Sequence, residues 1–202
     1  GKVAAATTAT VLVERFAAER IVFTGVAGGL GDGVQVGDVV VAQTLLQHDM
    51  DASPLFPRFE VPLYGRSHFA TDAALTAILL EAASDYCAGA EGQLGSEKVA
   101  LFGLKKVQAH HGLLVAGDRF VATAAESHAL RNALPGVLAV DMESAAVAQV
   151  CFDYHIPFAA VRTISDRADD AAHVDFPLFL AQLAAPYAQG IMVKFLQLLL
   201  KK

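Results

Sequence analysis

The stretch that most constrains the fold is Val137–Asp166, because it has the pattern of a strand, a helix and a second strand. The apolar runs Val137–Val140 and Pro157–Ile164 have the length and composition of strands, and Glu143–Phe152 between them has the composition of a helix. Strands of this apolar kind are typical of sheets that are covered on both faces. The unit therefore predicts an α/β fold built on a central sheet.

Acidic and polar residues follow each of these two strands. Asp141 and Glu143 come after the first strand, and Ser165 and Asp166 come after the second. Ligands of open α/β sheets bind outside the carboxyl ends of the strands. We therefore expect a functional site where these side chains meet.

The rest of the chain also alternates between helical and strand-like stretches. Helices are expected over Lys2–Arg20, Thr71–Cys87, Ala122–Leu134 and Phe176–Leu200, and strands over Ile21–Thr24, Val36–Leu46 and Lys106–Val115. Three connections stand out: the glycine-rich loop Gly25–Gly33, the loop Gln47–Gly65 with its prolines and aromatic residues, and the turn-rich link Gly89–Lys98. No repeat or linker interrupts the pattern. We predict one α/β domain over residues 1–202, with a mixed, mainly parallel sheet flanked by helices.

Composition narrows the classes of partner. The chain carries 15 Lys and Arg against 21 Asp and Glu, a net charge of −6, which argues against a nucleic-acid partner. The apolar tail Phe176–Leu200 is interrupted by polar residues and a proline, so an amphipathic helix is favoured over a membrane span. Cys87 and Cys151 lack metal or redox spacing, and no signal peptide is visible. We expect free core thiols, no metal site and a cytoplasmic protein.

Taken singly, the candidate site residues have ordinary explanations. Glu143 could be a helix-end acid, Asp166 a turn or cap residue, and Phe120 a core residue. The glycine-rich loop matches neither GxGxxG nor a P-loop, so a tight turn is its default interpretation. Arg162 is more informative, because an arginine inside an apolar strand is rarely buried without a carboxylate. We predict that Glu143 or Asp166 is its partner.

Five segments together resemble a known family, the nucleoside phosphorylase/nucleosidase superfamily, in order and approximate spacing. Within it, the chain is most similar to the 5′-methylthioadenosine/S-adenosylhomocysteine nucleosidases. The segments are Thr24–Leu30, Val36–Val41, Gly117–Val121, Val140–Ser144 and Val161–Asp166. Met142-Glu143 and Ser165-Asp166 are the specific motifs among them.

The resemblance implies hydrolysis of the N-glycosidic bond to adenine through an oxocarbenium-like transition state. Asp166 would protonate N7 of the leaving base, which requires a carboxyl whose pKa is raised by burial or by a neighbouring acid. Ser165 would orient that acid, and Glu143 would accept hydrogen bonds from the ribose hydroxyls. Arg162 would hold carboxylates and the water network. No cofactor is implied.

The resemblance also implies a set of binding residues. Phe120 would stack on adenine, the backbone of Val121 would contact the edge of the base, and Met142 would pack on the sugar. Ala27 and Gly28 would form the floor of the site, and Phe176 would form a wall of the pocket for the 5′-substituent. In this family a loop of the partner subunit closes that pocket. The loop Gln47–Gly65 suits this role, which implies a homodimer.

The chain departs from the family pattern at two places. Phe23 stands where the phosphorylases have a phosphate-binding arginine, which favours water as the nucleophile. The sequence from Gly1 matches the family only after its first strand, so the glutamate that activates water has no counterpart. We therefore expect an N-terminally incomplete chain that is poorly stable and inactive alone. The alternatives are a purine nucleoside phosphorylase-type enzyme and a catalytically inactive nucleoside-binding subunit.

Overall fold

The structure is a computed structural model that describes residues 1–104 and 106–201, with only the backbone of residues 173–175. The strands are β1 (Ile21–Gly29), β2 (Val39–Gln47), β3 (His68–Ala70), β4 (Ala109–Ala116), β5 (Val137–Asp141) and β6 (Phe158–Asp166). The helices are α1 (Lys2–Phe16), α2 (Ala73–Ala88), α3 (Ala90–Leu94), α4 (Ser96–Leu101), α5 (Ala124–Ala133), α6 (Ser144–Asp153), α7 (Ala172–Gln182) and α8 (Ala184–Leu199). The strand–helix–strand unit predicted over Val137–Asp166 is β5–α6–β6.

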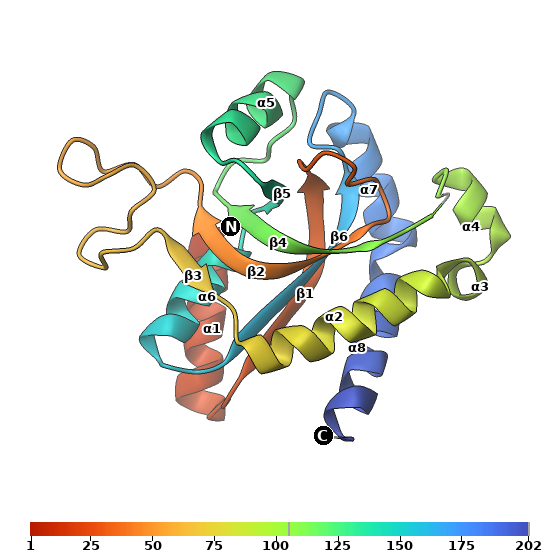
Figure 1. The fold of residues 1–202 in the computed structure, drawn as a ribbon, viewed down its shortest axis with the longest axis horizontal. Coiled ribbons are helices and arrows are strands. Elements are labelled where there is room, and N and C mark those ends of the chain that lie inside the picture. The colour runs from red at the N-terminus through yellow and green to blue at the C-terminus, as the bar shows by residue number, and fades with distance from the viewer. Residues whose placement is uncertain (105, 202) are drawn as a thin grey trace.

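The six strands form a mixed sheet in the order β3-β2-β4-β5-β1-β6 (Figure 1). Its two longest ladders, β1 with β6 and β2 with β4, are parallel. The pairs β1–β5, β2–β3 and β2–β6 are antiparallel. The α/β fold with a mixed, mainly parallel sheet is confirmed. Because β6 also pairs with β2, the sheet closes into a barrel, which the sequence did not predict.

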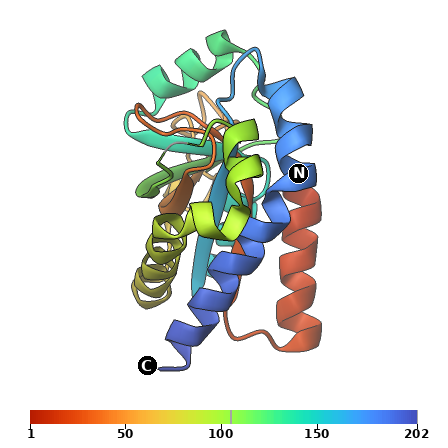
Figure 2. The ribbon, with the colours of Figure 1, turned by 90° about the vertical axis from the view of Figure 1, so that its right-hand side faces the viewer.

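Helices cover the barrel on two sides, with α1 and α6 on one and α2 and α8 on the other (Figure 1). In Figure 2, α1 lies at the right of the view and α2 at the left. The alternation of side chains along β2 supplies both interfaces. Val40 and Ala42 belong to the cluster with α1 and α6, whereas Val39 and Val41 belong to the cluster with α2 and α8. All four side chains are fully buried, which explains why this strand is an uninterrupted apolar run.

The glycine-rich stretch Gly25–Gly33, predicted as a loop, differs from the prediction. It is not a loop from Gly25 onward, because β1 continues through Gly29 and pairs with both β5 and β6. A Cβ atom on Gly25 would lie 2.6 Å from Nη1 of Arg162 on the neighbouring strand. Glycine is therefore needed here for close approach of a side chain rather than for a turn.

The C-terminal segment also differs from the prediction. Instead of one helix over Phe176–Leu200, the chain forms α7 and α8, which meet at a bend of 54°. Phe179, Leu183 and Tyr187 around the bend are all fully buried, so the bend keeps both helices against the same core. Within the described residues, no single helix is long and apolar enough to span a membrane, and only this bent pair passes by length and composition.

Smaller differences concern the connections, whereas helix α2 and the cysteines agree with the prediction. The link Gly89–Lys98 contains the short helix α3 and the start of α4, and the short strand β3 was not predicted. The helix predicted over Thr71–Cys87 is confirmed as α2, capped by Asp72, whose side chain accepts a hydrogen bond from the Leu75 nitrogen at 2.8 Å. Cys87 and Cys151 are free and buried as predicted, and desolvation raises the pKa of each to about 12.

Candidate active site

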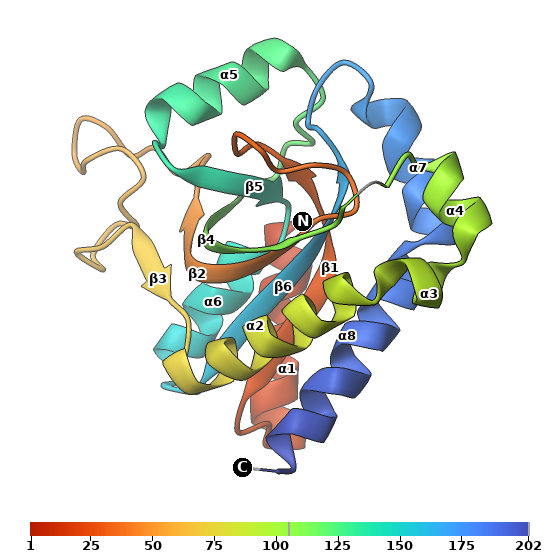
Figure 3. The same cartoon turned by 45° about the vertical axis from the view of Figure 1, so that its right-hand side comes forward.

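A cavity lies at the ends of β1, β5 and β6. Figure 3 shows these strand ends below α5 and beside α7. The residues that line it are Val26, Ala27, Gly28, Arg119, Phe120, Val121, Val140, Asp141, Met142, Glu143, Ser165, Asp166 and Phe176. The site expected at the carboxyl ends of the strands is therefore present as a real cavity.

Asp166 ends β6 and is only 1% exposed, with both carboxyl oxygens held by hydrogen bonds. The Ser165 hydroxyl donates to Oδ2 at 2.8 Å, and the backbone nitrogen of Ala168 donates to Oδ1 at 2.8 Å. A Cβ atom on Gly28 would lie 3.0 Å from Oδ1, so glycine at that position leaves room for the carboxyl group. The acid is thus fixed in orientation at the edge of the cavity.

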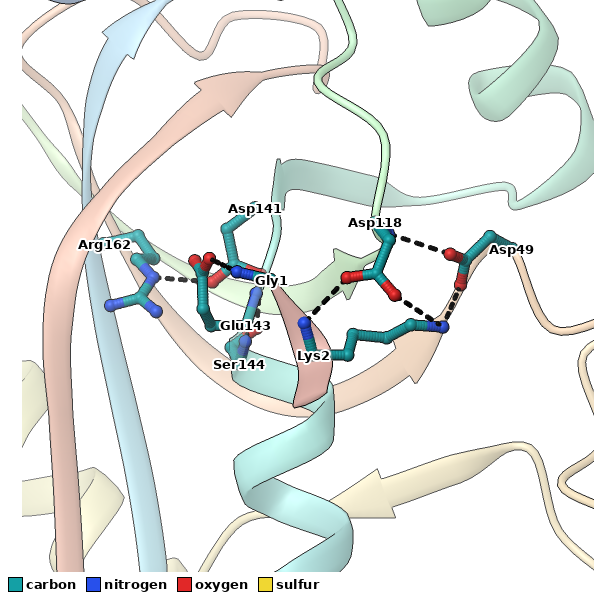
Figure 4. Close-up of polar contacts among 8 residues, drawn as sticks. All are labelled: Gly1, Lys2, Asp49, Asp118, Asp141, Glu143, Ser144 and Arg162. Carbon is teal, nitrogen blue, oxygen red and sulfur yellow. Dashed lines mark hydrogen bonds and ion pairs between the residues drawn. The ribbon is translucent and has the colours of Figure 1, made fainter. Parts of the chain in front are cut away.

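Glu143 lies at the N-cap position of α6, but its side chain makes no capping hydrogen bond. Its Oε1 accepts a hydrogen bond from the backbone nitrogen of Gly1 at 2.6 Å (Figure 4). Asp141 caps the helix instead, because its Oδ1 accepts from the nitrogen and the hydroxyl of Ser144 at 3.2 and 2.8 Å. Glu143 is therefore more than a helix-end acid: it presents a half-exposed carboxylate to the cavity.

The prediction that Glu143 or Asp166 is the partner of Arg162 is wrong. Its Nε donates to Oδ2 of Asp141 at 2.6 Å, and both side chains are 2% exposed (Figure 4). Neither Glu143 nor Asp166 is the carboxylate that holds it in this way. Gly25 on β1 pairs in register with Arg162, and its missing side chain lets the guanidinium reach across β1 towards β5. Asp141 lines the cavity, whereas Arg162 does not line it and contacts Asp141 from behind the wall.

The aromatic part of the cavity comes from two separate segments. Phe120 follows β4 and is 43% exposed, so it is not a core residue. Its ring meets that of Phe176 on α7 edge to face, with 5.6 Å between the centroids. Arg119 beside it forms an ion pair with Glu126 on α5. The two rings form an apolar part of the cavity wall.

A polar network connects the loop Gln47–Gly65 to the segment that carries Phe120. Lys2 Nζ contacts Oδ1 of Asp49 at 2.7 Å, and the nitrogen of Asp118 donates to Oδ2 of Asp49 at 2.8 Å (Figure 4). The backbone nitrogen of Lys2 donates to Asp118 at 2.7 Å. The root of the loop is thus fixed beside the cavity, whereas the side chains of Leu55 and Leu63 further along it are exposed.

The structure brings together nearly all residues that the sequence placed in the site. Ala27, Gly28, Phe120, Val121, Met142, Glu143, Ser165, Asp166 and Phe176 line one cavity, and Arg162 lies beneath it. Sequence reasoning did not name Val26, Arg119 and Val140 as lining residues. It expected Asp141 at the site, as an acid that follows a strand, but assigned it no role. Among the described residues, no group of three or more His, Cys, Asp or Glu side chains is arranged to hold a metal ion.

Comparison with known proteins agrees with this geometry. The family model of the phosphorylase superfamily matches residues 1–197. A 5′-methylthioadenosine/S-adenosylhomocysteine nucleosidase of Shewanella denitrificans is 33% identical over 193 residues, covering 96% of this chain and 75% of the relative. One of Bacillus thuringiensis is 34% identical over 198 residues, covering 98% and 77%. The chain belongs to this nucleosidase family of the phosphorylase superfamily.

Solved structures of nucleosidases in the family show the same fold. The Neisseria meningitidis nucleosidase in complex with methylthio-immucillin-A aligns with a TM-score of 0.83 at 34% identity, covering 97% of this chain and 77% of that one. The Streptococcus pneumoniae nucleosidase with the transition-state inhibitor MT-ImmA aligns with a TM-score of 0.82 at 30% identity, covering 98% and 78%. The resemblance to these nucleosidases and the fold class are therefore both confirmed.

Proposed function

We propose that the protein hydrolyses the N-glycosidic bond of 5′-methylthioadenosine, S-adenosylhomocysteine or a related adenosine nucleoside. The products are adenine and the 5′-substituted ribose. The observation that carries the proposal is the buried Asp166 carboxyl, held by two hydrogen bonds in the same cavity as Glu143 and Phe120. The names of its relatives, and a solved Colwellia psychrerythraea nucleosidase in complex with adenine, support the same reaction.

Asp166 is the general acid in this proposal. As the bond between C1′ and N9 breaks, its electron pair moves into the purine and N7 takes a proton from the carboxyl group. Positive charge develops on the ribose at the same time. Phe120 stacks on the adenine ring, and the Phe120–Phe176 wall keeps water from the base and the 5′-substituent.

Ser165 can serve both protonation states of Asp166. Its hydroxyl oxygen lies 2.8 Å from Oδ2 of Asp166 and 3.3 Å from the carbonyl oxygen of Ala27. When Asp166 is ionised, the hydroxyl donates to Oδ2. When Asp166 is protonated at Oδ2, the hydroxyl accepts from it and donates to Ala27. The acid is therefore supported before and after it gives up its proton.

Glu143 binds the ribose in this proposal, and its replacement by glutamine gives a specific prediction. A carboxylate accepts hydrogen bonds from the ribose hydroxyls, and its charge stabilises the developing oxocarbenium ion. Glu143→Gln should raise KM and lower kcat, with kcat/KM falling on the order of a hundred-fold for 5′-methylthioadenosine. Steady-state kinetics with the nucleoside and its 2′-deoxy analogue measure this. Normal kinetics in the variant would remove Glu143 from the ribose site.

Water rather than phosphate is the proposed nucleophile. Phe23, at the position of the phosphate-binding arginine, packs its ring against the Arg162 guanidinium, with 4.0 Å between Cζ and the ring centroid, and Nε of that guanidinium donates to Asp141. Adenine release should therefore proceed at the same rate in phosphate-free buffer and in phosphate, and the sugar product should be a free sugar. A rate that rises in proportion to phosphate, with a sugar 1-phosphate as product, would favour phosphorolysis.

The assembly, the compartment and the metabolic role are part of the same proposal. We infer a homodimer in which the loop Gln47–Gly65 closes the partner's 5′-pocket. The exposed Leu55 and Leu63 side chains on that loop support a covered surface. Sedimentation equilibrium would show a monomer if this were wrong. The two buried free thiols suit a reducing cytoplasm, and the products suit methionine salvage.

A further inference from the structure

We propose that Ser127 on α5 is a positioning residue for Asp166, acting through the peptide of Ala168. The inference rests on the proposed function, because it assigns Asp166 the role of general acid. Ser127 does not line the cavity and belongs to none of the motifs that identified the family. It nevertheless connects α5 to the turn that holds the acid.

A short chain of hydrogen bonds makes the connection. The Ser127 hydroxyl donates to the carbonyl oxygen of Ala168, and the Ala168 nitrogen donates to Oδ1 of Asp166 at 2.8 Å. The exposed fractions of Ser127, Ala168 and Asp166 are 4%, 0% and 1%. Since water does not reach these groups, each hydrogen bond has no solvent substitute and fixes the geometry of the next.

The backbone of Ala168 needs outside support. Its φ is +49°, in the left-handed region that favours glycine and costs an alanine free energy. This conformation turns its N–H back towards the carboxyl group two residues earlier. On one side Ser127 holds the carbonyl group. On the other side Gly28 closes in, because a Cβ atom there would lie 2.9 Å from the Ala168 Cβ.

The first turn of α5, which carries Ser127, is itself held in place by polar contacts. Thr123 caps the helix by accepting from the Glu126 nitrogen at 3.2 Å. Glu126 in turn pairs with Arg119, next to Phe120. The first turn of α5 therefore contacts the segment that carries Phe120. Through Ser127 it also contacts the turn at Ala168, which holds the Asp166 carboxyl group. Ser127 therefore helps to align the Asp166 carboxyl group with the adenine, in addition to any contribution to folding.

Removing the Ser127 hydroxyl should affect only the step in which Asp166 protonates the leaving adenine. In Ser127→Ala the Ala168 carbonyl loses its donor, the peptide is free to leave the left-handed conformation, and its N–H no longer fixes Asp166. The kcat for 5′-methylthioadenosine should fall about ten-fold or more, while KM stays within about two-fold, because Glu143 and Phe120 are untouched.

A second substrate separates positioning of the acid from structural damage. A 4-nitrophenyl glycoside of 5-methylthioribose releases nitrophenolate, which leaves without protonation. Its turnover by Ser127→Ala should stay within about two-fold of the parent protein. The matched control is Thr76→Val, which deletes another buried helix hydroxyl, equally 4% exposed and remote from the cavity. The control should lower thermal stability and leave kcat for both substrates unchanged.

The outcomes distinguish this inference from the proposed function. If the parent protein, expressed from its complete gene, releases no adenine from the nucleoside, the proposed function fails. If the parent protein is active and Ser127→Ala slows both substrates equally, or slows neither, the positioning role of Ser127 is overturned while the function stands. A fall in kcat for the nucleoside alone in Ser127→Ala, with kcat for both substrates unchanged in Thr76→Val, would establish the positioning role of Ser127.

Discussion

Replacing Asp166 by asparagine should leave a folded protein that releases adenine from 5′-methylthioadenosine about a hundred-fold or more slowly, because an amide cannot protonate N7. The fold should survive, since the asparagine carbonyl can still accept from the Ala168 nitrogen and its NH₂ group can donate to the Ser165 hydroxyl oxygen. Steady-state kinetics and a thermal unfolding curve on the same preparation separate the chemical effect from the structural one.

Asp170 offers the matched control, because it is an aspartate in the same turn and is exposed. Its Oδ1 is a weak acceptor, 3.4 Å from the nitrogen of Ala124. Asp170→Asn should therefore keep kcat and KM close to those of the parent protein. A near-normal kcat in Asp166→Asn would refute the general-acid assignment. Equal losses in both variants would point to damage of the whole turn.

The second large effect is on stability and concerns the buried pair of Arg162 and Asp141. Replacing Arg162 by methionine fills much of the volume but leaves a carboxylate that is 2% exposed without its cation. Breaking one side of such a pair costs about 3–5 kcal/mol. Asp141→Asn should also destabilise, because its NH₂ group would face the Arg162 Nε as a second donor. Urea unfolding at constant m-value measures both losses.

A double-mutant cycle tests whether the two residues act as a pair. The protein with both Arg162→Met and Asp141→Asn should be more stable than the sum of the single losses implies, with a coupling of about 1–3 kcal/mol. Additive losses would show that the two side chains do not interact in solution. Turnover should fall in all three variants, because Asp141 caps α6 and so places Glu143 at the cavity.

The sequence predicted the parts of the fold that depend on local pattern. The apolar runs that became β5 and β6, the helix α2 with its Asp72 cap, and the acids at the strand ends are short-range signals. The site residues followed because they belong to contiguous motifs, such as Met142-Glu143 after β5 and Ser165-Asp166 at the end of β6. Both motifs line the cavity, although β5 pairs antiparallel with β1 and β6 pairs parallel with it.

What the sequence did not predict depends on contacts between distant segments. Closure of the sheet requires β6 to pair with β2, and no local pattern encodes that pairing. Gly25 looked like part of a turn because its function, making room for Arg162, involves a neighbouring strand. For the same reason Asp141 was not recognised as the partner of Arg162. The bend at Leu183, in contrast, had a local signal, because Pro186 in the first turn of α8 has no N–H to donate to the preceding turn.

The central claim is that this cavity is built for the transition state of adenine release from a 5′-substituted nucleoside. Isothermal titration of the protein, expressed from its complete gene, with methylthio-immucillin-A tests it most directly, since that compound occupies a nucleosidase of known structure. We predict binding at least about a hundred-fold tighter than that of adenine, and most of this advantage should be lost in Asp166→Asn. Affinity no greater than that of adenine, or equal affinity in the variant, would contradict the account.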